Sequence, residues 1–318
     1  MMRARDMSLE VYLCNVPTDM RKSIDGLAAL VQGVLDKNPF DGKLFVFTNK
    51  RRDKIKILYW ERSGFVVWFT KELKKDCQLT GLYDIQYGRV EKLRRELSSG
   101  PIGKSSLQAL LESCDLMIEA VNANSTKEIV REALLNKKDV IAMSVGKLLD
   151  AQDLFSLARK RGCHLLIPSG AIAGIDAIKS ASLARIRKIN LTTRKPLNGF
   201  TNTPYLLRKG IDLAAIKKET VLFKGSVDSE VKFFPQNINV AATLALASRA
   251  KDKITVCIMT SPKYKSNSHE IEIIGDFGRI VTRTDNVVSP ENPKTSYLAV
   301  LSGMQALKQF CQGTGIGT

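Results

Sequence analysis

The residue of this chain best suited to proton transfer is His269, in the segment Asn267-Ser268-His269-Glu270. An imidazole titrates near neutrality, so a histidine in a binding site can both accept and return a proton. The alternative is a histidine on a strand surface. The chain has one other histidine, His164, and its cysteines are scattered without a CxxC pair. We therefore expect no zinc-type ligand cluster and no structural metal.

Two other segments could bind a ligand. Small residues fill Ser169–Gly174, between a predicted strand that ends at Ile167 and a predicted helix. They would let the backbone approach a ligand at the carboxyl edge of a sheet, or they simply allow a tight turn. Asn239 begins a predicted apolar helix, where its amide can bind a ligand or cap the helix.

Strands and helices alternate from about Leu79 and would position these residues. The predicted strands are Leu116–Val121, Val140–Met143 and His164–Ile167, and the helices between them are Thr126–Leu135 and Asp150–Arg161. Gly162 stands where the second helix should stop, and Asp150 could cap its start. Alternation at this spacing predicts a parallel sheet, which makes residues 79–175 half of a Rossmann-type domain.

The next part of the chain has a different pattern. Residues 176–290 begin in the predicted helix after Gly174. From about Lys188 they contain antiparallel-like strands with one helix, Asn239–Arg249, which predicts an α+β catalytic and dimerisation domain. The segment Ser289–Pro293 then breaks the chain before an amphipathic helix over residues 297–310. We expect this last helix to pack back on the Rossmann-type domain.

Residues 1–78 form a separate, small α+β segment in this interpretation. An extended stretch, Val11–Val16, precedes an amphipathic helix over residues 24–35. Short apolar runs at Leu44–Phe47, Ile55–Trp60 and Phe65–Phe69 then predict an antiparallel meander.

Composition limits the class of protein. The 318 residues are 44% hydrophobic and 25% charged, as in ordinary globular proteins, and no apolar run could span a bilayer. Charges at Arg3, Arg5, Asp6 and Glu10 argue against a secretory peptide, so we expect a cytoplasmic protein with reduced cysteines.

The net charge of +17 could indicate nucleic acid or a small anionic ligand. The first 80 residues hold 15 basic and 10 acidic side chains, and the remaining residues hold 34 and 22. Because the charge is spread along the chain, a basic solvated surface is the better interpretation.

The N-terminal segment resembles a known family over residues 11–77. The stretches PTDMRKSIDGLAALV, LFVFTNKRRDKIKILYW and GFVVWFTKEL are similar to the Orf-two accessory proteins of IS sixty-six-type insertion elements. This resemblance implies a transposon accessory protein associated with DNA. The basic turn Lys50–Lys54 beside Tyr59, Trp60 and Trp68 would suit phosphate contacts and base stacking, or it is a charged hairpin over an aromatic core.

The rest of the chain, from about Leu82 to Leu307, resembles L-aspartate dehydrogenase. The similar stretches, in order, are DVIAMSVGKLLD, PSGAIAGIDAI, TTRKP, LFKGSV, FPQNINVAATLALA, NSHEIEIIGDFG and SPENPKTS. The resemblance implies a Rossmann cofactor domain and an α+β catalytic domain that commonly dimerises. It also implies oxidation of L-aspartate with NAD or NADP to iminoaspartate, which hydrolyses to oxaloacetate and ammonia, a reaction linked to NAD biosynthesis.

The resemblance also assigns roles to single residues. It places the active-site histidine on His269, where proton removal from nitrogen and water addition to the imine both need an acid/base group. It places cofactor contacts on Ala173 and Asn239. Cations for the two substrate carboxylates are not ranked by the sequence. The candidates are Arg194, Lys195, Lys224 and Lys294.

One expected motif is absent. No Gly-x-Gly-x-x-Gly precedes Leu82, although Asp84 stands where the family holds the adenosine ribose. The fold class is therefore α/β with a truncated Rossmann-type sheet, an α+β catalytic domain and an accessory segment in front. Loss of the first strand should expose two sheet edges and weaken both folding and cofactor binding. A DNA-associated transposition accessory protein and an inactive fusion stay open as alternatives.

Overall fold

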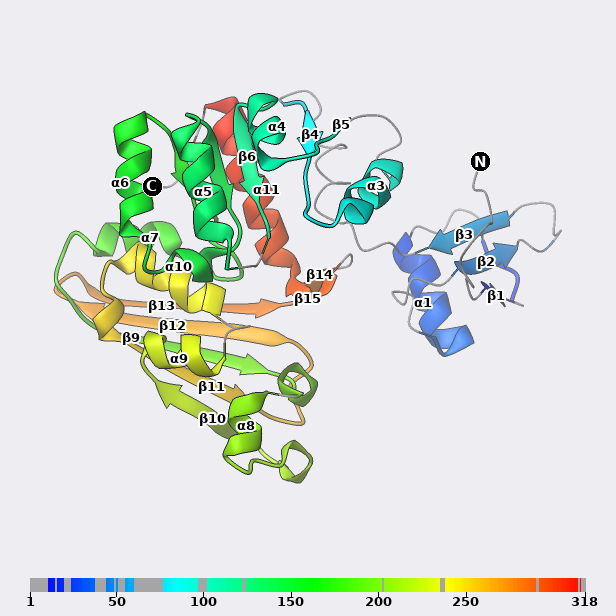
Figure 1. Cartoon of the computed structure of the whole chain (residues 1–318). Coiled ribbons are helices and arrows are strands. Elements are labelled where there is room, and N and C mark those ends of the chain that lie inside the picture. The colour runs from blue at the N-terminus through cyan, green and yellow to red at the C-terminus, as the bar shows by residue number, and fades with distance from the viewer. Residues whose placement is uncertain are drawn as a thin grey trace. The chain divides into compact units, whose positions relative to one another are not determined.

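A computed structural model shows the chain as two units (Figure 1). Unit 1 comprises residues 1–65 and 290–293, and unit 2 comprises residues 66–289 and 294–318. The structure describes residues 11–14, 16–19, 24–37, 44–48, 50, 55–59, 77–96, 102–121, 124–201, 203–234, 238–289, 292–313 and 315, which are the basis of every structural statement below.

Unit 1 contains one helix and three paired strands among its described residues. These are β1 (Val11–Cys14), α1 (Ile24–Leu35), β2 (Leu44–Thr48) and β3 (Ile55–Tyr59). The predicted helix is confirmed, and β2 pairs antiparallel with β3 as expected, whereas β1 joins β2 in parallel. The predicted strand Phe65–Phe69 and the proposed stacking residues Trp60 and Trp68 lie outside the described residues.

The first part of unit 2 alternates short strands and helices. Its elements are β4 (Gly81–Leu82), α3 (Tyr87–Glu96), β5 (Ile102–Gly103), α4 (Leu107–Glu112), β6 (Leu116–Glu119), α5 (Thr126–Leu135), β7 (Asp139–Ala142), η1 (Val145–Leu148), α6 (Gln152–Arg161) and β8 (Leu165–Leu166). Gly162 ends α6 in the left-handed conformation, as predicted. Asp150 does not cap this helix, because Ala151 is the N-cap residue and Asp150 pairs with Lys251 instead.

The parallel strands form two separate sheets. One contains β4 and β5, and the other has the order β6-β7-β8. In a Rossmann sheet of order 3-2-1-4-5-6, these correspond to strands 3-2 and 4-5-6. The division falls at the place of strand 1, and no described strand pairs with the free edge of β4 or β6. The expected truncated parallel sheet is confirmed.

A mixed five-stranded sheet forms the second part of unit 2. Its strands are β9 (Ile186–Lys195), β10 (Thr220–Gly225), β11 (Ile254–Thr260), β12 (Asn267–Gly275) and β13 (Gly278–Asn286). The order is β10-β11-β9-β12-β13, and β9 runs parallel to β11 while the other neighbours are antiparallel. The expectation of a purely antiparallel pattern is thus wrong at one pair.

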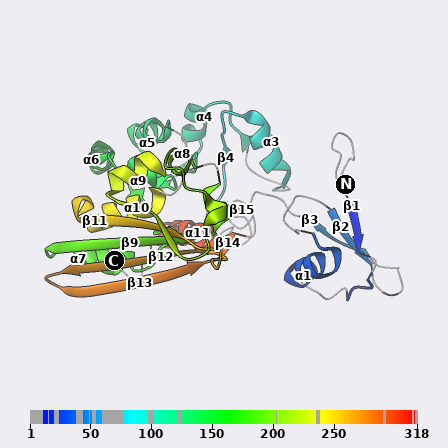
Figure 2. The ribbon, with the colours of Figure 1, turned by 90° about the horizontal axis from the view of Figure 1, so that it is seen from below.

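Three further helices accompany α10 (Ile238–Ser248) in this part, each with seven residues or fewer: α7 (Ile175–Ala181), α8 (Pro204–Arg208) and α9 (Val227–Phe233). The predicted helix after Gly174 is confirmed as α7, whereas the prediction of one helix after Lys188 is wrong, because α8 and α9 were not expected. Such short helices span about two turns and show no clear helical periodicity. The short 3₁₀ turns are η2 (Leu197–Phe200), η3 (Leu213–Ala215) and η4 (Lys251–Lys253). In Figure 2, α9 and α10 lie on one side of the sheet.

The core explains why α10 is almost entirely apolar. Residues of α10, including Ala241 and Leu244, are buried against Leu191 and Val256 of the sheet, while α10 also packs against η1 and α7. A helix covered on several sides needs no polar stripe. Alternate residues of β11 are buried, as expected of a strand with one face in the core.

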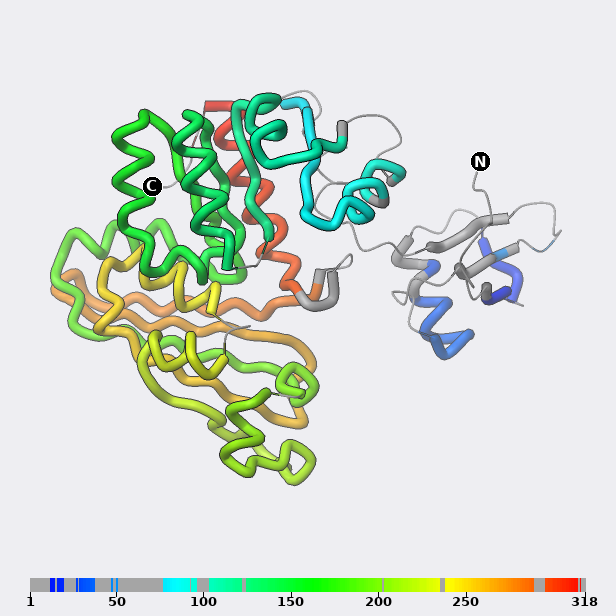
Figure 3. Tube along the Cα trace, in the orientation of Figure 1, coloured from blue at the N-terminus to red at the C-terminus, as the bar shows by residue number. Residues whose placement is uncertain are grey.

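The C-terminal helix α11 (Tyr297–Gln312) follows β14 (Val288–Ser289) and β15 (Asn292–Ser296). It returns to the parallel strands, where Leu307 is buried with Ile141 of β7. Figure 3 follows this course along the backbone. The N-terminal end of α11 is thereby fixed between the two parts of unit 2.

Candidate active site

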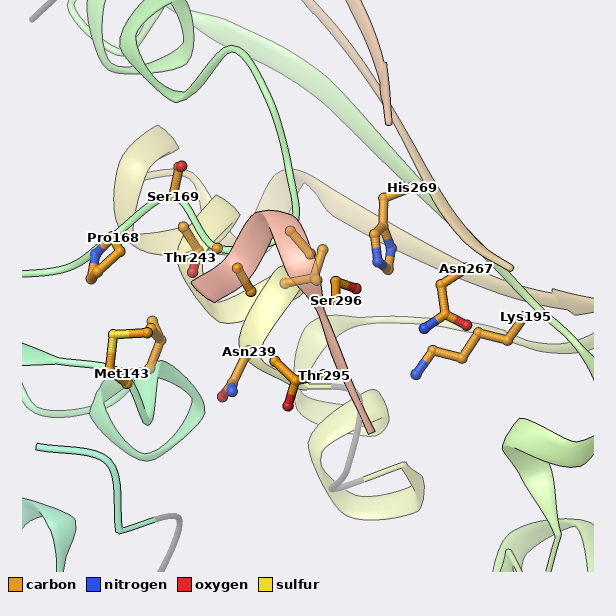
Figure 4. A pocket seen from close by; sticks show the side chains of 15 residues that line it. Met143, Pro168, Ser169, Lys195, Asn239, Thr243, Asn267, His269, Thr295 and Ser296 are labelled. Carbon is orange, nitrogen blue, oxygen red and sulfur yellow. The ribbon is translucent and has the colours of Figure 1, made fainter. Parts of the chain in front are cut away.

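A cavity of about 170 Å³ lies where the loops after β7 and β8 meet the mixed sheet. Its lining comes from both parts of unit 2: Met143, Val145, Pro168, Ser169, Gly170, Ala171, Lys195, Asn239, Val240, Thr243, Asn267, His269, Thr295, Ser296 and Ala299. Figure 4 shows His269, Asn267 and Lys195 together on one side of it. Ligands of open α/β sheets bind at this carboxyl edge of the parallel strands.

His269 is held in the wall of the cavity by β9. It is the third residue of β12, pairs with Thr193 in the strand register, and is only 5% exposed. The Thr193 hydroxyl lies 3.1 Å from its Nδ1, so Nε2 is the ring nitrogen left for a ligand. Burial lowers the pKa of His269 to about 4, and the positive charge of Lys195 contributes. The imidazole is therefore a neutral base at pH 7.

Lys195 and Asn267 join His269 because of strand alternation. Thr193 and Lys195 are two residues apart on β9, and Asn267 and His269 are two apart on β12, so each pair points to one face. Burial lowers the pKa of Lys195, while the negative charge of Glu230 raises it. The cavity thus combines a neutral base, a cation and an amide.

The structure separates the four candidate cations. Only Lys195 lines the cavity among those whose side chains are described. Arg194 points to the opposite face of β9 and forms an ion pair of 3.1 Å with Glu270. Lys224 is exposed on β10. The side chain of Lys294 lies outside the described residues, although its neighbours Thr295 and Ser296 line the cavity.

Asn239 connects α10 to the parallel-strand part of unit 2. It is the second residue of α10, and its Oδ1 accepts a hydrogen bond of 2.9 Å from the backbone N–H of Gly146 in η1. A Cβ atom on Gly146 would collide with Ile238 and crowd the Asn239 Oδ1, so only glycine fits there. With its oxygen engaged in this way, the Asn239 amide still has two N–H donors for a ligand.

The loop of small residues after β8 contributes its first half to the cavity. Ser169, Gly170 and Ala171 line it, and the backbone N–H of Gly170 donates to the Ser302 hydroxyl at 3.0 Å. Ala173 is exposed and stands outside the lining. The structure therefore brings His269 and Asn239 together but does not bring Ala173 into the same cavity.

The edge of the sheet near β4 offers one acidic group. Asp84 follows β4, and its Oδ1 accepts a hydrogen bond of 2.7 Å from the backbone N–H of Gln86, while Arg89 pairs with it at 3.5 Å. A side chain at this position suits an adenosine ribose. No glycine-rich loop precedes it in the sequence. The residues thus fit the nicotinamide end of a dinucleotide, and the usual pyrophosphate loop is missing.

Sequence reasoning missed several residues that shape the site. Glu119, which is buried, accepts hydrogen bonds from Val121 (2.9 Å), Thr126 (3.1 Å) and Ser144 (3.2 Å) and so ties together the loops after β6 and β7. Asn267 was within reach of prediction, because it lies two residues before His269 on one strand. The role of Glu119 had no comparable signal.

The parallel strands, the mixed sheet and a cavity with a buried histidine are the features of a Rossmann-type NAD(P)-dependent dehydrogenase. Matches to family descriptions agree: "Homoserine dehydrogenase, NAD binding domain" matches residues 65–168, and "Aspartate dehydrogenase, C-terminal" matches residues 176–310.

Individual relatives identify the family. An L-aspartate dehydrogenase of Methanosarcina mazei is 41% identical over 246 residues, covering 76% of this chain and 91% of the relative. One of Methanococcus maripaludis is 38% identical over 256 residues, covering 78% and 94%. The crystal structure of aspartate dehydrogenase from Thermotoga maritima aligns with a TM-score of 0.56 and 25% identity, covering 69% of this chain and 85% of that one. The chain belongs to the L-aspartate dehydrogenase family.

The N-terminal resemblance is confirmed as well. Residues 9–79 match the family "IS66 Orf2 like protein". This match overlaps the nucleotide-binding match over residues 65–79. Within the described residues, no helix is long and apolar enough to cross a membrane.

Proposed function

We propose that this protein oxidises L-aspartate with NAD or NADP to iminoaspartate, which water converts to oxaloacetate and ammonia. The observation that carries the proposal is the meeting of His269 and Lys195 with Asn239 in one cavity. A dicarboxylic amino acid needs a cation for its carboxylates and a base for its amino group. The family of the chain supports this substrate.

NAD(P), when bound, supplies the acceptor for the hydride that leaves the substrate Cα. We assign its nicotinamide end to the Asn239 amide and to the backbone of the loop after β8. Ala173 belongs to this loop and stays a proposed cofactor contact, through the family resemblance alone. Asp84 is the proposed ribose partner.

The residues of the chain perform the proton steps. Lys195 binds a substrate carboxylate, and neutral His269 takes a proton from the substrate ammonium through Nε2, so that nitrogen presents a free electron pair as the hydride leaves. Thr193 holds the ring through Nδ1. After the imidazolium has released this proton to solvent, the neutral imidazole serves as base for the water that adds to the imine carbon.

Replacement of His269 tests the proposal. We expect His269→Ala to lower kcat/KM for aspartate by about 100-fold or more, because one positioned acid/base group contributes that much. His164→Ala is the matched control, since His164 lies on the surface and pairs with Asp139. Spectrophotometry of aspartate-dependent NAD(P)H formation measures both. Full turnover by His269→Ala would refute the assignment.

The quaternary structure and location belong to the same proposal. We propose a homodimer, on the family resemblance, and a cytoplasmic location. Analytical ultracentrifugation should give about twice the 35.3 kDa chain mass.

A second candidate function rests on the match of residues 9–79 to the IS66 Orf2 like family. If this segment has a DNA-associated accessory role, replacing Arg51 and Arg52 by uncharged residues should weaken DNA binding and make it less dependent on salt concentration. The same replacement should leave aspartate oxidation unchanged, which separates this function from the first. Unaltered DNA affinity would argue against it.

A further inference from the structure

Glu230 is a buried acid that the mechanism above does not use. It is the fourth residue of α9 and is 1% exposed. Its Oε2 has no hydrogen-bond partner among the described residues. A carboxyl oxygen removed from water without a partner destabilises the fold by a few kcal/mol, roughly. A buried acid that destabilises the fold in this way suggests a function for Glu230.

The position of α9 brings Glu230 close to the site. The helix begins after Ser226, whose hydroxyl caps it, and Val227 and Phe234 anchor it in the core. It packs against β11 and α10. β11 runs beside β9, and Thr260 at its end pairs with Lys195 and donates a hydrogen bond of 2.8 Å to the Lys195 carbonyl oxygen. Glu230 therefore lies on a helix that packs against β11, and Lys195 lies on the strand that pairs with β11.

The charge of Lys195 links Glu230 to His269. Among the described residues, the charge of Lys195 acts on the pKa of Glu230 and on that of His269, and the charge of Glu230 acts on the pKa of Lys195. The neighbouring helix α10 has no charged residue. On β11, the titratable group is Cys257, which responds to Lys224 and Arg194 instead. Glu230 therefore acts on the site through Lys195.

We propose that Glu230 is a positioning residue that keeps the Lys195 ammonium charged and available for a substrate carboxylate. This inference rests on the proposed function, because it takes Lys195 as the carboxylate-binding cation. It adds a residue that contacts neither substrate nor cofactor.

The pH dependence of carboxylate binding follows from the effect of burial on the pKa values of Glu230 and Lys195. Burial raises the pKa of Glu230 to about 8 and lowers that of Lys195 below its usual value. Below pH 8, Glu230 is mostly protonated, so its negative charge does not act on Lys195. Above pH 8, Glu230 ionises and favours the ammonium form of Lys195, which burial would otherwise deprotonate. Glu230 thus extends carboxylate binding into the alkaline range.

The test compares the full-length protein with Glu230→Gln from pH 6.5 to pH 10. We expect similar KM values for aspartate at pH 7. At pH 9.5, KM of the variant should be roughly tenfold higher with little change in kcat, because without the Glu230 charge the alkaline limb of the KM profile moves to lower pH. Asp228→Asn is the matched control, since this exposed carboxylate lies on the same helix. Profiles that superimpose for wild type and Glu230→Gln would overturn the proposal.

A second variant covers the case in which Glu230→Gln does not fold. Lys195→Arg carries a group that stays charged at every pH used, so its alkaline limb in KM should disappear. An unchanged limb would show that Lys195 is not the titrating group and would overturn the proposal.

Failure of the proposed function has a different signature. It would appear as no aspartate-dependent NAD(P) reduction by wild type at any pH. Calorimetric titration with L-aspartate at pH 7.5 and 9.5 then decides the inference alone. Weaker binding by Glu230→Gln only at pH 9.5 supports it, and equal affinities or no binding overturn it.

Discussion

His269 couples the stability of the protein to pH. Its pKa is lowered to about 4 in the fold from an ordinary value of 6.5. The unfolded chain therefore binds more protons between these values, and the folded state loses stability as pH falls from 6.5 to 4. The full effect is about 3 kcal/mol.

We predict that His269→Gln removes this part of the acid sensitivity. Chemical denaturation at pH 7 and pH 4.5 measures the free energy of unfolding. Between pH 7 and pH 4.5, the free energy of unfolding should fall by about 2 kcal/mol less in the variant than in wild type. The same decline in both proteins would contradict a buried, neutral histidine.

Glu230 changes the stability of the fold with pH in the opposite direction to His269. Its pKa is raised to about 8 in the fold, so its contribution to stability is present below pH 4.5 and declines as pH rises to 8. We predict that Glu230→Gln is more stable than wild type at pH 8 by about 1 kcal/mol or more, because the variant buries no ionisable group. Equal unfolding free energies at pH 8 would indicate that Glu230 is solvated.

The partners of His269 illustrate what sequence alone provides at this scale. The chemistry of imidazole pointed to His269, and alternation could have added Asn267 and Lys195 to the same faces of their strands. Thr193 could not be found, since its contact with His269 joins residues 76 apart. Such a contact depends on the register between β9 and β12, which no local pattern specifies.

The contact of η1 with α10 fixes the side of the cavity to which we assign the cofactor. The Gly146 N–H binds Asn239, and a Cβ at residue 146 would collide with Ile238. We predict that Gly146→Ala separates η1 from α10, costs about 1–3 kcal/mol of stability and weakens NAD(P) binding. Thermal unfolding and calorimetric titration measure the two effects.

Gly88→Ala provides the matched control for this variant. A Cβ at Gly88 meets nothing within 4 Å, and the residue lies in α3. Alanine favours a helix over glycine, so this variant should be as stable as wild type or more. Equal behaviour of the two variants would contradict the close approach at Gly146.

Element boundaries were predictable where local signals were strong. The helix over Thr126–Leu135 was predicted with its observed ends, and Gly162 ended α6 as expected. The parallel pairing of β9 with β11 was not predictable, because the strand order of a mixed sheet depends on packing between distant segments. The short helices α8 and α9 were not predicted, because they are too short to show a helical spacing of apolar residues.

The divided parallel sheet governs the behaviour of the whole molecule. Among the described strands, none pairs with β4 or β6 at the place of a first strand, and no glycine loop precedes β4 in the sequence. We predict that replacing residues 1–64 with a strand, a Gly-x-Gly-x-x-Gly loop and a helix taken from an intact Rossmann domain increases NAD(P) affinity at least tenfold. It should also raise the melting temperature, because it pairs both edges.

Calorimetric titration with NAD and NADP tests this replacement. A variant that only lacks residues 1–64 serves as control and should not gain affinity. If the natural chain already binds in the micromolar range and the replacement adds nothing, other residues compensate for the missing loop.

The order of strands in the mixed sheet also governs how the protein folds. β9 pairs with β11 and β12, which lie about 60 to 80 residues further along the chain. The centre of the mixed sheet therefore forms only after these distant segments have come together. Closing such long loops raises the contact order and slows folding. Thr193 and Lys195 therefore meet His269 only when this closure is complete. During refolding from denaturant, ligand binding should return with the slow step, after the local helices have formed.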